Sequence, residues 1–158
     1  MQEARKQDMK VSDEEKTKFA CDIATIGNLY SNRVAFFEGL TNMKFNIKIW
    51  GNPAAHWMDV GKIKDMLFSE FLVYEEKSKV FNGAKIVLNN LHPAEIYGIN
   101  VRAFEIAACK GFQLINHRKD IDQLFTLSTE IIAFNNYSDL LEKINYFLEH
   151  DMERMQIA

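Results

Sequence analysis

Two arginines stand where a predicted helix follows a predicted strand, and both are placed to bind an anion. Arg33 comes shortly after the turn at Gly27-Asn28, and Arg102 falls in the first turn of a helix that Asn100 caps. Free backbone N–H groups and the helix dipole favour negative charge at a helix N-terminus, so an arginine there can complete a phosphate site. The alternatives are a plain turn with a solvated Arg33, and an ion pair of Arg102 with Glu105 on the helix surface.

Two further side chains could contact a bound sugar. Glu105 lies three residues after Arg102, on roughly the same side of the helix, where its carboxylate could accept hydrogen bonds from vicinal hydroxyls such as those of a ribose. His92 follows a predicted strand and could contact a sugar or a phosphate, although a lone histidine in a loop is more often merely solvated. The histidines have no metal-ligand spacing, and the GxGxxG and GxxxxGK[ST] signatures are absent. No metal site is therefore predicted.

The elements that must position these residues alternate between short apolar strands and amphipathic helices. Strands are predicted from residue 22 to the break at 27–28 and over 45–50, 85–90, 112–116 and 131–134, and helices over 31–40, 74–84, 100–109, 121–125 and 138–148. Loops and short helical turns are predicted for 54–72. This alternation indicates an α/β fold with a doubly wound, Rossmann-like parallel sheet of about five strands and helices on both faces. Ligands of such sheets bind at the carboxyl ends of the strands.

Composition limits the domain count and the classes of partner. The chain has 158 residues, 47% hydrophobic and 26% charged, which suits one domain with a proper core. Residues 1–19 are predicted to be a polar arm or interdomain linker, and residues 20–158 the domain. A net charge of −3 argues against binding nucleic acid or anionic membranes through bulk charge.

The sequence also predicts where the protein resides. The polar N-terminus does not read as a signal peptide, and the apolar runs are too short to span a bilayer. Cys21 and Cys109 form no disulfide framework, which suits a reducing compartment. A cytoplasmic location is expected.

At this point a family resemblance becomes visible. The segments KIVLN (85–89), His92-Pro93 and GINVRAFEIAACKGFQL (98–114) together resemble the C-terminal domain of GT-B-fold group 1 glycosyltransferases. The likeness is greatest to the CgeB-like, spore-maturation branch. Shorter similarities at CDIATIGNLY (21–30) with Arg33, at IWG (49–51), and at YFL (146–148) before Glu153 and Arg154 extend it from about residue 20 to the end.

The resemblance implies a nucleotide-sugar-binding half of a GT-B fold. It implies contacts with the donor diphosphate and sugar for four residues: Arg33, His92, Asn100 and Arg102. It implies that Glu105 holds the ribose and that Trp50 and Asn52 lie near the nucleobase. No cofactor is implied beyond the nucleoside diphosphate sugar as substrate, and metal-independent chemistry is expected, with protein cations neutralising the leaving diphosphate.

Two departures from the family pattern bear on function. Many retaining members carry a second glutamate at the position that Tyr97 occupies here, whereas Glu95 stands nearby out of register, so the stereochemical outcome is left open. The acceptor-binding half of the two-domain fold is not recognisable in this sequence. We expect a donor-binding domain that is incomplete alone and works with an N-terminal Rossmann half or a partner chain on an unknown acceptor. The alternative is a non-catalytic Rossmann-like module that binds a protein partner.

Overall fold

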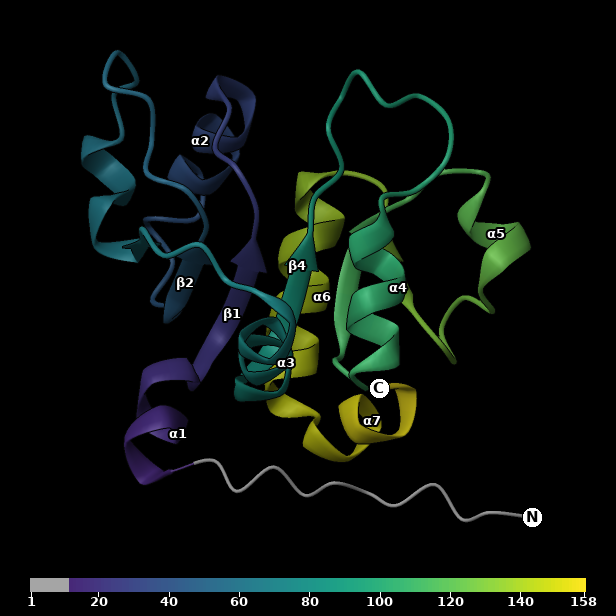
Figure 1. Ribbon diagram of the computed structural model, residues 1–158. Helices are drawn as coiled ribbons and strands as arrows, with labels where there is room; N and C mark the ends of the chain where they lie inside the picture. Colours follow the sequence, from purple (N-terminus) through teal and green to yellow (C-terminus); the bar gives the residue numbers. More distant parts are fainter. Residues whose placement is uncertain (1–11) are drawn as a thin grey trace.

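The protein forms a doubly wound α/β domain around one parallel sheet, described here for residues 12–158 from a computed structural model (Figure 1). The sheet has six strands in the order β3-β2-β1-β4-β5-β6, and every neighbouring pair is parallel. The strands are β1 (Cys21–Ile26), β2 (Ile47–Trp50), β3 (Leu67–Phe68), β4 (Ala84–Asn89), β5 (Gln113–Asn116) and β6 (Ile132–Phe134). The predicted fold class is confirmed, with one strand more than expected.

The central strands are apolar on both faces because helices cover both sides of the sheet. In β1, Ile23 lies opposite Ile47 of β2 and Ile86 of β4, and all three are buried. The next residue, Ala24, turns to the other face and packs with Val87. Two apolar layers therefore sandwich the sheet, and each is closed by its own helices.

The helices divide between the two faces. They are α1 (Asp13–Phe19), α2 (Ser31–Glu38), α3 (Tyr74–Gly83), α4 (Val101–Ala108), α5 (Ile121–Leu124), α6 (Tyr137–Glu149) and α7 (Asp151–Ile157), with a 3₁₀ turn, η1, over Gly61–Met66. Phe37 of α2 and Ile144 of α6 join the core cluster that contains Ile23. Val80 of α3 and Ile106 of α4 join the opposite cluster. Figure 1 accordingly shows α3 and α4 in front of the sheet and α6 behind it.

The predicted polar arm contains a helix. Residues 1–11 of that arm lie outside the described part of the chain. Residues 13–19 form α1, which begins with a capping box between Ser12 and Glu15 and is exposed except at its end. There Phe19 is buried, 5.4 Å from the ring of Trp50. The domain boundary at residue 20 stays a prediction.

Two local predictions are corrected. The stretch 54–72 contains the short strand β3 as well as η1, because Ile49 and Trp50 of β2 pair with Leu67 and Phe68. A strand of two residues carries too little periodicity to be recognised in the sequence. The helix predicted over 31–40 is also shorter, because α2 begins at Ser31 and ends at Glu38, and its N-cap residue, Tyr30, makes no side-chain cap.

The chain reverses its direction of winding between β1 and β4. It leaves β1 toward β2 and β3 at one edge, then returns to place β4 on the other side of β1. The connections that follow β1 and β4 therefore diverge at the carboxyl edge, where doubly wound sheets bind their ligands. In Figure 1 the loops after β2 and β4 rise above this edge. Within residues 12–158, no helix is both long and apolar enough to cross a membrane.

Candidate functional site

A crevice of about 230 Å³ opens at the carboxyl edge between the segments that follow β1 and β4. One wall comes from the β1–α2 connection and the start of α2, and the other from the β4–α4 loop and the start of α4. The lining residues are Asn28, Tyr30, Asn32, Arg33, Asn90, Leu91, His92, Glu95, Asn100 and Arg102. Four of the seven residues predicted for the donor site thus share one cavity: Arg33, His92, Asn100 and Arg102.

Arg33 is the buried cation in the wall of the crevice that α2 contributes. Only 6% of the residue is exposed, and its guanidinium donates from three nitrogens. Nε donates to Oδ1 of Asn90 at 3.0 Å, and Nη1 donates to the Asn28 carbonyl at 2.9 Å. Nη2 donates to Oγ1 of Thr25 at 2.5 Å and to the carbonyl of Ile26 at 3.4 Å. Every acceptor is uncharged, so the positive charge of Arg33 is held in place without being neutralised.

Arg102 reaches the same point from the opposite wall. A Cβ placed on Gly27 would lie 2.6 Å from Nη2 of Arg102 and 2.8 Å from Nη1 of Arg33. Any side chain at Gly27, directly after β1, would have to displace these guanidinium groups, and its φ of +137° itself favours glycine. Among residues 12–158, no carboxylate lies within salt-bridge distance of either guanidinium.

The pKa values of both arginines are lowered, chiefly because both side chains are withdrawn from water. Desolvation, followed by the positive charge of Arg102, lowers the pKa of Arg33 to about 10. Desolvation also lowers the pKa of Arg102, and the nearby carboxylates of Glu105 and Glu95 partly offset that effect. Arg33 still carries its proton at neutral pH, because a pKa of about 10 lies well above 7. The crevice therefore holds positive charge that an entering anion would stabilise.

The fold engages three of the four hydrogen-bonding positions of the Asn100 amide, and one Nδ2 hydrogen is left for a ligand. Its Oδ1 accepts from the backbone N–H of Ala103 at 3.1 Å, which confirms the predicted N-cap. The same amide exchanges two hydrogen bonds with buried Asn89, at 3.0 and 2.8 Å. Asn89 in turn donates to Gln113, whose amide donates to the Ala103 carbonyl. This network fixes the N-terminus of α4 at the crevice.

His92 lies at the rim, packed edge-on against Tyr30 with ring centroids 5.2 Å apart. Its Nδ1 accepts from the backbone N–H of Ala94 at 3.2 Å, which leaves Nε2 as the nitrogen available to a ligand. Glu95 lines the same cavity, whereas Tyr97 is 86% exposed and lies outside the lining. The carboxylate beside the crevice thus comes from the residue that the sequence places out of register.

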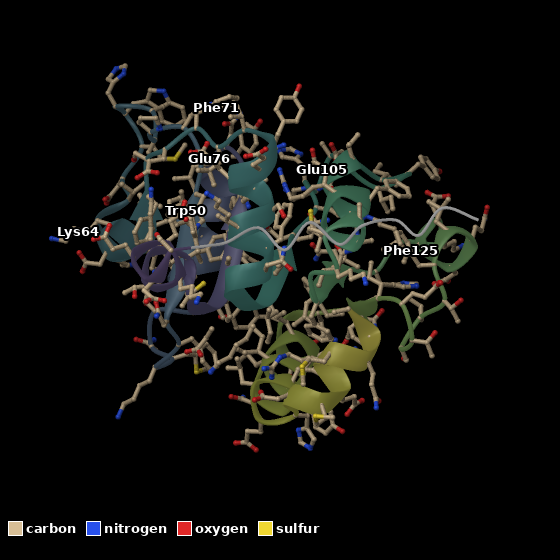
Figure 2. All side chains as sticks on the ribbon, turned by 60° about the horizontal axis from the view of Figure 1, so that its bottom comes forward. Trp50, Lys64, Phe71, Glu76, Glu105 and Phe125 are labelled. Atoms are coloured by element: carbon tan, nitrogen blue, oxygen red, sulfur yellow. The ribbon has the colours of Figure 1, made fainter. Side chains whose placement is uncertain are left out.

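Glu105 stands one turn along α4 and is absent from the cavity lining. Its carboxylate, labelled in Figure 2, accepts from Nζ of Lys77 in α3 at 3.0 Å; the distance is that of the ion pair. The alternative reading of an Arg102–Glu105 surface ion pair is therefore wrong, because Lys77 is the partner. The pair is only partly buried, so the Glu105 carboxylate keeps exposed surface that a hydroxyl could reach.

Trp50 and Asn52 lie at different depths beside the crevice. The indole of Trp50 is fully buried on the α3 face, stacked on Phe68 with centroids 4.6 Å apart. Its Nε1–H has no hydrogen-bond partner in the described part of the chain. Asn52 is exposed and donates to Oδ1 of Asn28 at 2.9 Å. Of the two residues expected near a nucleobase, only Asn52 presents its side chain at the surface.

Three important residues were missed by sequence reasoning. Thr25 and Asn90 hold Arg33, and Lys77 holds Glu105. Thr25 carried a weak signal, since a hydroxyl within an apolar strand needs a partner. Asn90 and Lys77 carried none, because their partners lie 57 and 28 residues away in the sequence. No group of side chains suited to a metal ion occurs among residues 12–158, and metal-independent chemistry stays a prediction.

Comparisons with known proteins point to one family. A family model described as "Glycosyl transferase-like" matches residues 33–158. The spore protein CgeB of Bacillus subtilis (strain 168) is 26% identical over 151 residues, covering 87% of this chain and 46% of that protein. The chain thus spans about half the length of this curated relative. The crystal structure of TarM aligns with a TM-score of 0.61 and 14% identity, over 86% of this chain and 30% of TarM, which shows a shared fold. The resemblance predicted from the sequence is confirmed.

Proposed function

The chain belongs to the glycosyl transferase-like family, and from that premise we propose that its crevice binds a nucleoside diphosphate sugar as donor for sugar transfer. Arg33 and Arg102 would bind the diphosphate, with the N-termini of α2 and α4 adding backbone donors. His92 Nε2 would reach a phosphate or sugar oxygen at the rim. Metal-free neutralisation of the leaving diphosphate is part of the proposal.

One observation carries the proposal. Two guanidinium groups meet beside Gly27 at the switch point of the sheet, and within residues 12–158 neither has a carboxylate partner. Cations that serve stability alone are normally paired when buried, because an unpaired buried charge is costly. An anion with two adjacent charges, such as a diphosphate, would bridge them and offset that cost.

The proposal also gives positions for the ribose and the base of the donor. Glu105 would accept from ribose hydroxyls while Lys77 keeps its carboxylate oriented. The base would lie near Asn52 and the backbone of Gly51, since the ring of Trp50 is covered. Glu95 lines the cavity and would face the sugar.

Catalysis is proposed to need a second half. The chain spans 46% of CgeB, and the crevice is partly open to solvent. A second Rossmann half, joined to this chain or supplied by a partner, would provide the acceptor site and exclude water. The acceptor, the base and the stereochemistry are left open by this proposal.

Calorimetric titration tests donor binding directly. We expect UDP or GDP to bind the unchanged chain, and Arg33→Ala to abolish binding. Glu105→Gln should weaken UDP more than inorganic pyrophosphate, because pyrophosphate has no ribose. The matched control is Glu142→Gln, an exposed change on α6 at the other face of the sheet. No binding of any nucleoside diphosphate, nucleotide sugar or pyrophosphate would refute the proposal.

A second candidate function rests on exposed apolar side chains in the segment between β4 and α4. Ile96, Tyr97 and Val101 are 69%, 86% and 73% exposed on the loop after β4 and the start of α4. A protein partner could cover these side chains, as expected for a non-catalytic interaction module. Pull-down with the unchanged chain and with a Tyr97→Ser variant separates the two candidate functions. If the chain is an interaction module, Tyr97→Ser should lose the protein partner while nucleotide binding stays unchanged.

A further inference from the structure

The groups that hold Arg33 share one chemical property, which is that none of them is charged. Nε donates to an asparagine amide, Nη1 to a backbone carbonyl, and Nη2 to a threonine hydroxyl and a second carbonyl. Asn90, which accepts from Nε at 3.0 Å, stands at the end of β4, on the opposite wall of the crevice from Arg33. An aspartate has almost the same shape and would make a stronger, charge-assisted bond there.

Neutral acceptors are unusual for an arginine that is 94% covered. Buried cations are ordinarily paired with carboxylates, because pairing offsets part of the loss of hydration. A carboxylate at position 90 would stabilise the empty crevice but would also cancel the charge that faces Arg102. The amide keeps the hydrogen bond and leaves the charge in place.

We propose that Asn90 is a positioning residue of the anion site: its amide oxygen orients the guanidinium of Arg33 while leaving the charge of that group available to the ligand. This inference rests on the proposed function, since it requires an anion in the crevice. Asn90 Oδ1 and Thr25 Oγ1 hold two nitrogens of the guanidinium, Nε and Nη2. The third nitrogen, Nη1, donates one hydrogen to the Asn28 carbonyl and approaches Gly27 beside Nη2 of Arg102, with its second hydrogen left for a ligand. The two nitrogens that flank this point are the pair a diphosphate would bridge.

A merely structural Asn90 predicts a different mutational pattern. If its only role were to satisfy a buried donor, removing the amide would lower stability, and ligand affinity would fall in proportion. An aspartate would restore both, because it satisfies the same N–H. A positioning role that depends on a neutral amide predicts different effects on stability and on ligand affinity. Aspartate would preserve the hydrogen bond, and with it the stability, but would neutralise Arg33 and so weaken ligand binding.

The test compares Asn90→Asp with Asn90→Ala in the 158-residue chain, with UDP and inorganic pyrophosphate as probes. Calorimetry gives the Kd, and thermal unfolding without ligand gives the midpoint. We expect Asn90→Asp to weaken both probes by at least about tenfold while the ligand-free midpoint stays level or rises. Asn90→Ala should lower the midpoint and weaken binding less. Asn42→Asp adds the same charge on an exposed turn at the amino edge of the sheet and should leave both measurements unchanged.

The outcomes are distinct. If the unchanged chain binds neither probe nor any nucleotide sugar, the proposed function fails and this inference fails with it. If the unchanged chain binds and Asn90→Asp binds within about twofold of it, the inference is overturned while the proposed function stands. A ligand-free midpoint for Asn90→Asp that drops to that of Asn90→Ala, or an unfolded Asn90→Asp, also overturns the inference, because neutrality would then serve stability alone.

Discussion

Replacing Arg102 by methionine should weaken anion binding and, at the same time, stabilise the empty protein. The change keeps an unbranched side chain with similar helix propensity and removes one positive charge. The terminal nitrogens of Arg102 and Arg33 both lie within 2.8 Å of one point beside Gly27, so they are less than about 6 Å apart. Arg102 makes no ion pair within residues 12–158 that its removal would break.

The magnitude follows from Coulomb's law. Two unit charges about 5.5 Å apart repel by about 0.8 kcal/mol in water and about 3 kcal/mol at an effective dielectric constant of 20. Because Arg102 is only half-buried, the lower end applies, about 1 kcal/mol, which raises the unfolding midpoint by about 2–4 °C for a domain of this size. Loss of one charge-assisted hydrogen bond to a phosphate costs about 1.5–3 kcal/mol, or about 10- to 150-fold in Kd.

The assay pairs thermal unfolding without ligand with calorimetric titration of UDP, for Arg102→Met and for Lys64→Met. Lys64 is exposed on η1, and its side chain extends into solvent away from Glu105 in Figure 2, so the control removes the same charge elsewhere. A lower ligand-free midpoint for Arg102→Met would refute the reasoning, because it would mean that Arg102 stabilises the empty fold. Unchanged affinity for UDP would refute the placement of the diphosphate.

The remaining predictions concern the frame of the crevice and the core beneath it. Gly27→Ala should lower the free energy of unfolding by about 1–3 kcal/mol, because alanine is strained at a φ of +137°. It should also weaken pyrophosphate binding, because the new methyl group displaces both guanidinium groups. Pyrophosphate binding equal to that of the unchanged chain would contradict this. Asn100→Ala should destabilise the protein by about 1–3 kcal/mol in urea unfolding, because it removes the α4 cap and a hydrogen-bond partner of Asn89. Asn100→Ser should recover part of this loss, because serine can also cap a helix. Equal urea midpoints for the two variants would argue against the cap. Burial raises the pKa of the Cys21 thiol to about 11, so iodoacetamide at about pH 8 should leave Cys21 unmodified until the protein is unfolded. Because that pKa is raised above its value of 9.0 in the unfolded chain, the stability associated with Cys21 is present below pH 9 and is lost as the pH rises toward 11.

Local pattern was sufficient for most of the fold. Strands such as β1 and β4 are apolar on both faces, and helices such as α6 place Leu140, Ile144 and Phe147 on one face, so period and length identified them. The cap at Asn100 was recognisable because an N-cap depends only on the residues that follow it. The alternation of elements then predicted the parallel sheet, and the sheet predicted the edge at which a ligand would bind.

What escaped the sequence depends on partners distant along the chain. Strand β3 exists because β2 offers it a pairing edge, and α1 is anchored where Phe19 meets Trp50. Glu105 turned out to pair with Lys77 of α3 rather than with its helical neighbour Arg102. Trp50 turned inward because its position in β2 points it to the α3 face, where Phe68 covers it.

The sequence by itself determined the α/β alternation, the start of α4 and the presence of two arginines after strands. Only the tertiary structure decided that Arg33 and Arg102 converge on Gly27 and that Asn90 and Thr25 hold the first of them. It also decided that no carboxylate of residues 12–158 lies within salt-bridge distance of either guanidinium. The physical reason is that secondary structure follows from interactions within a few residues. Charge compensation depends instead on distances through space, which are set when β1 and β4 become neighbours.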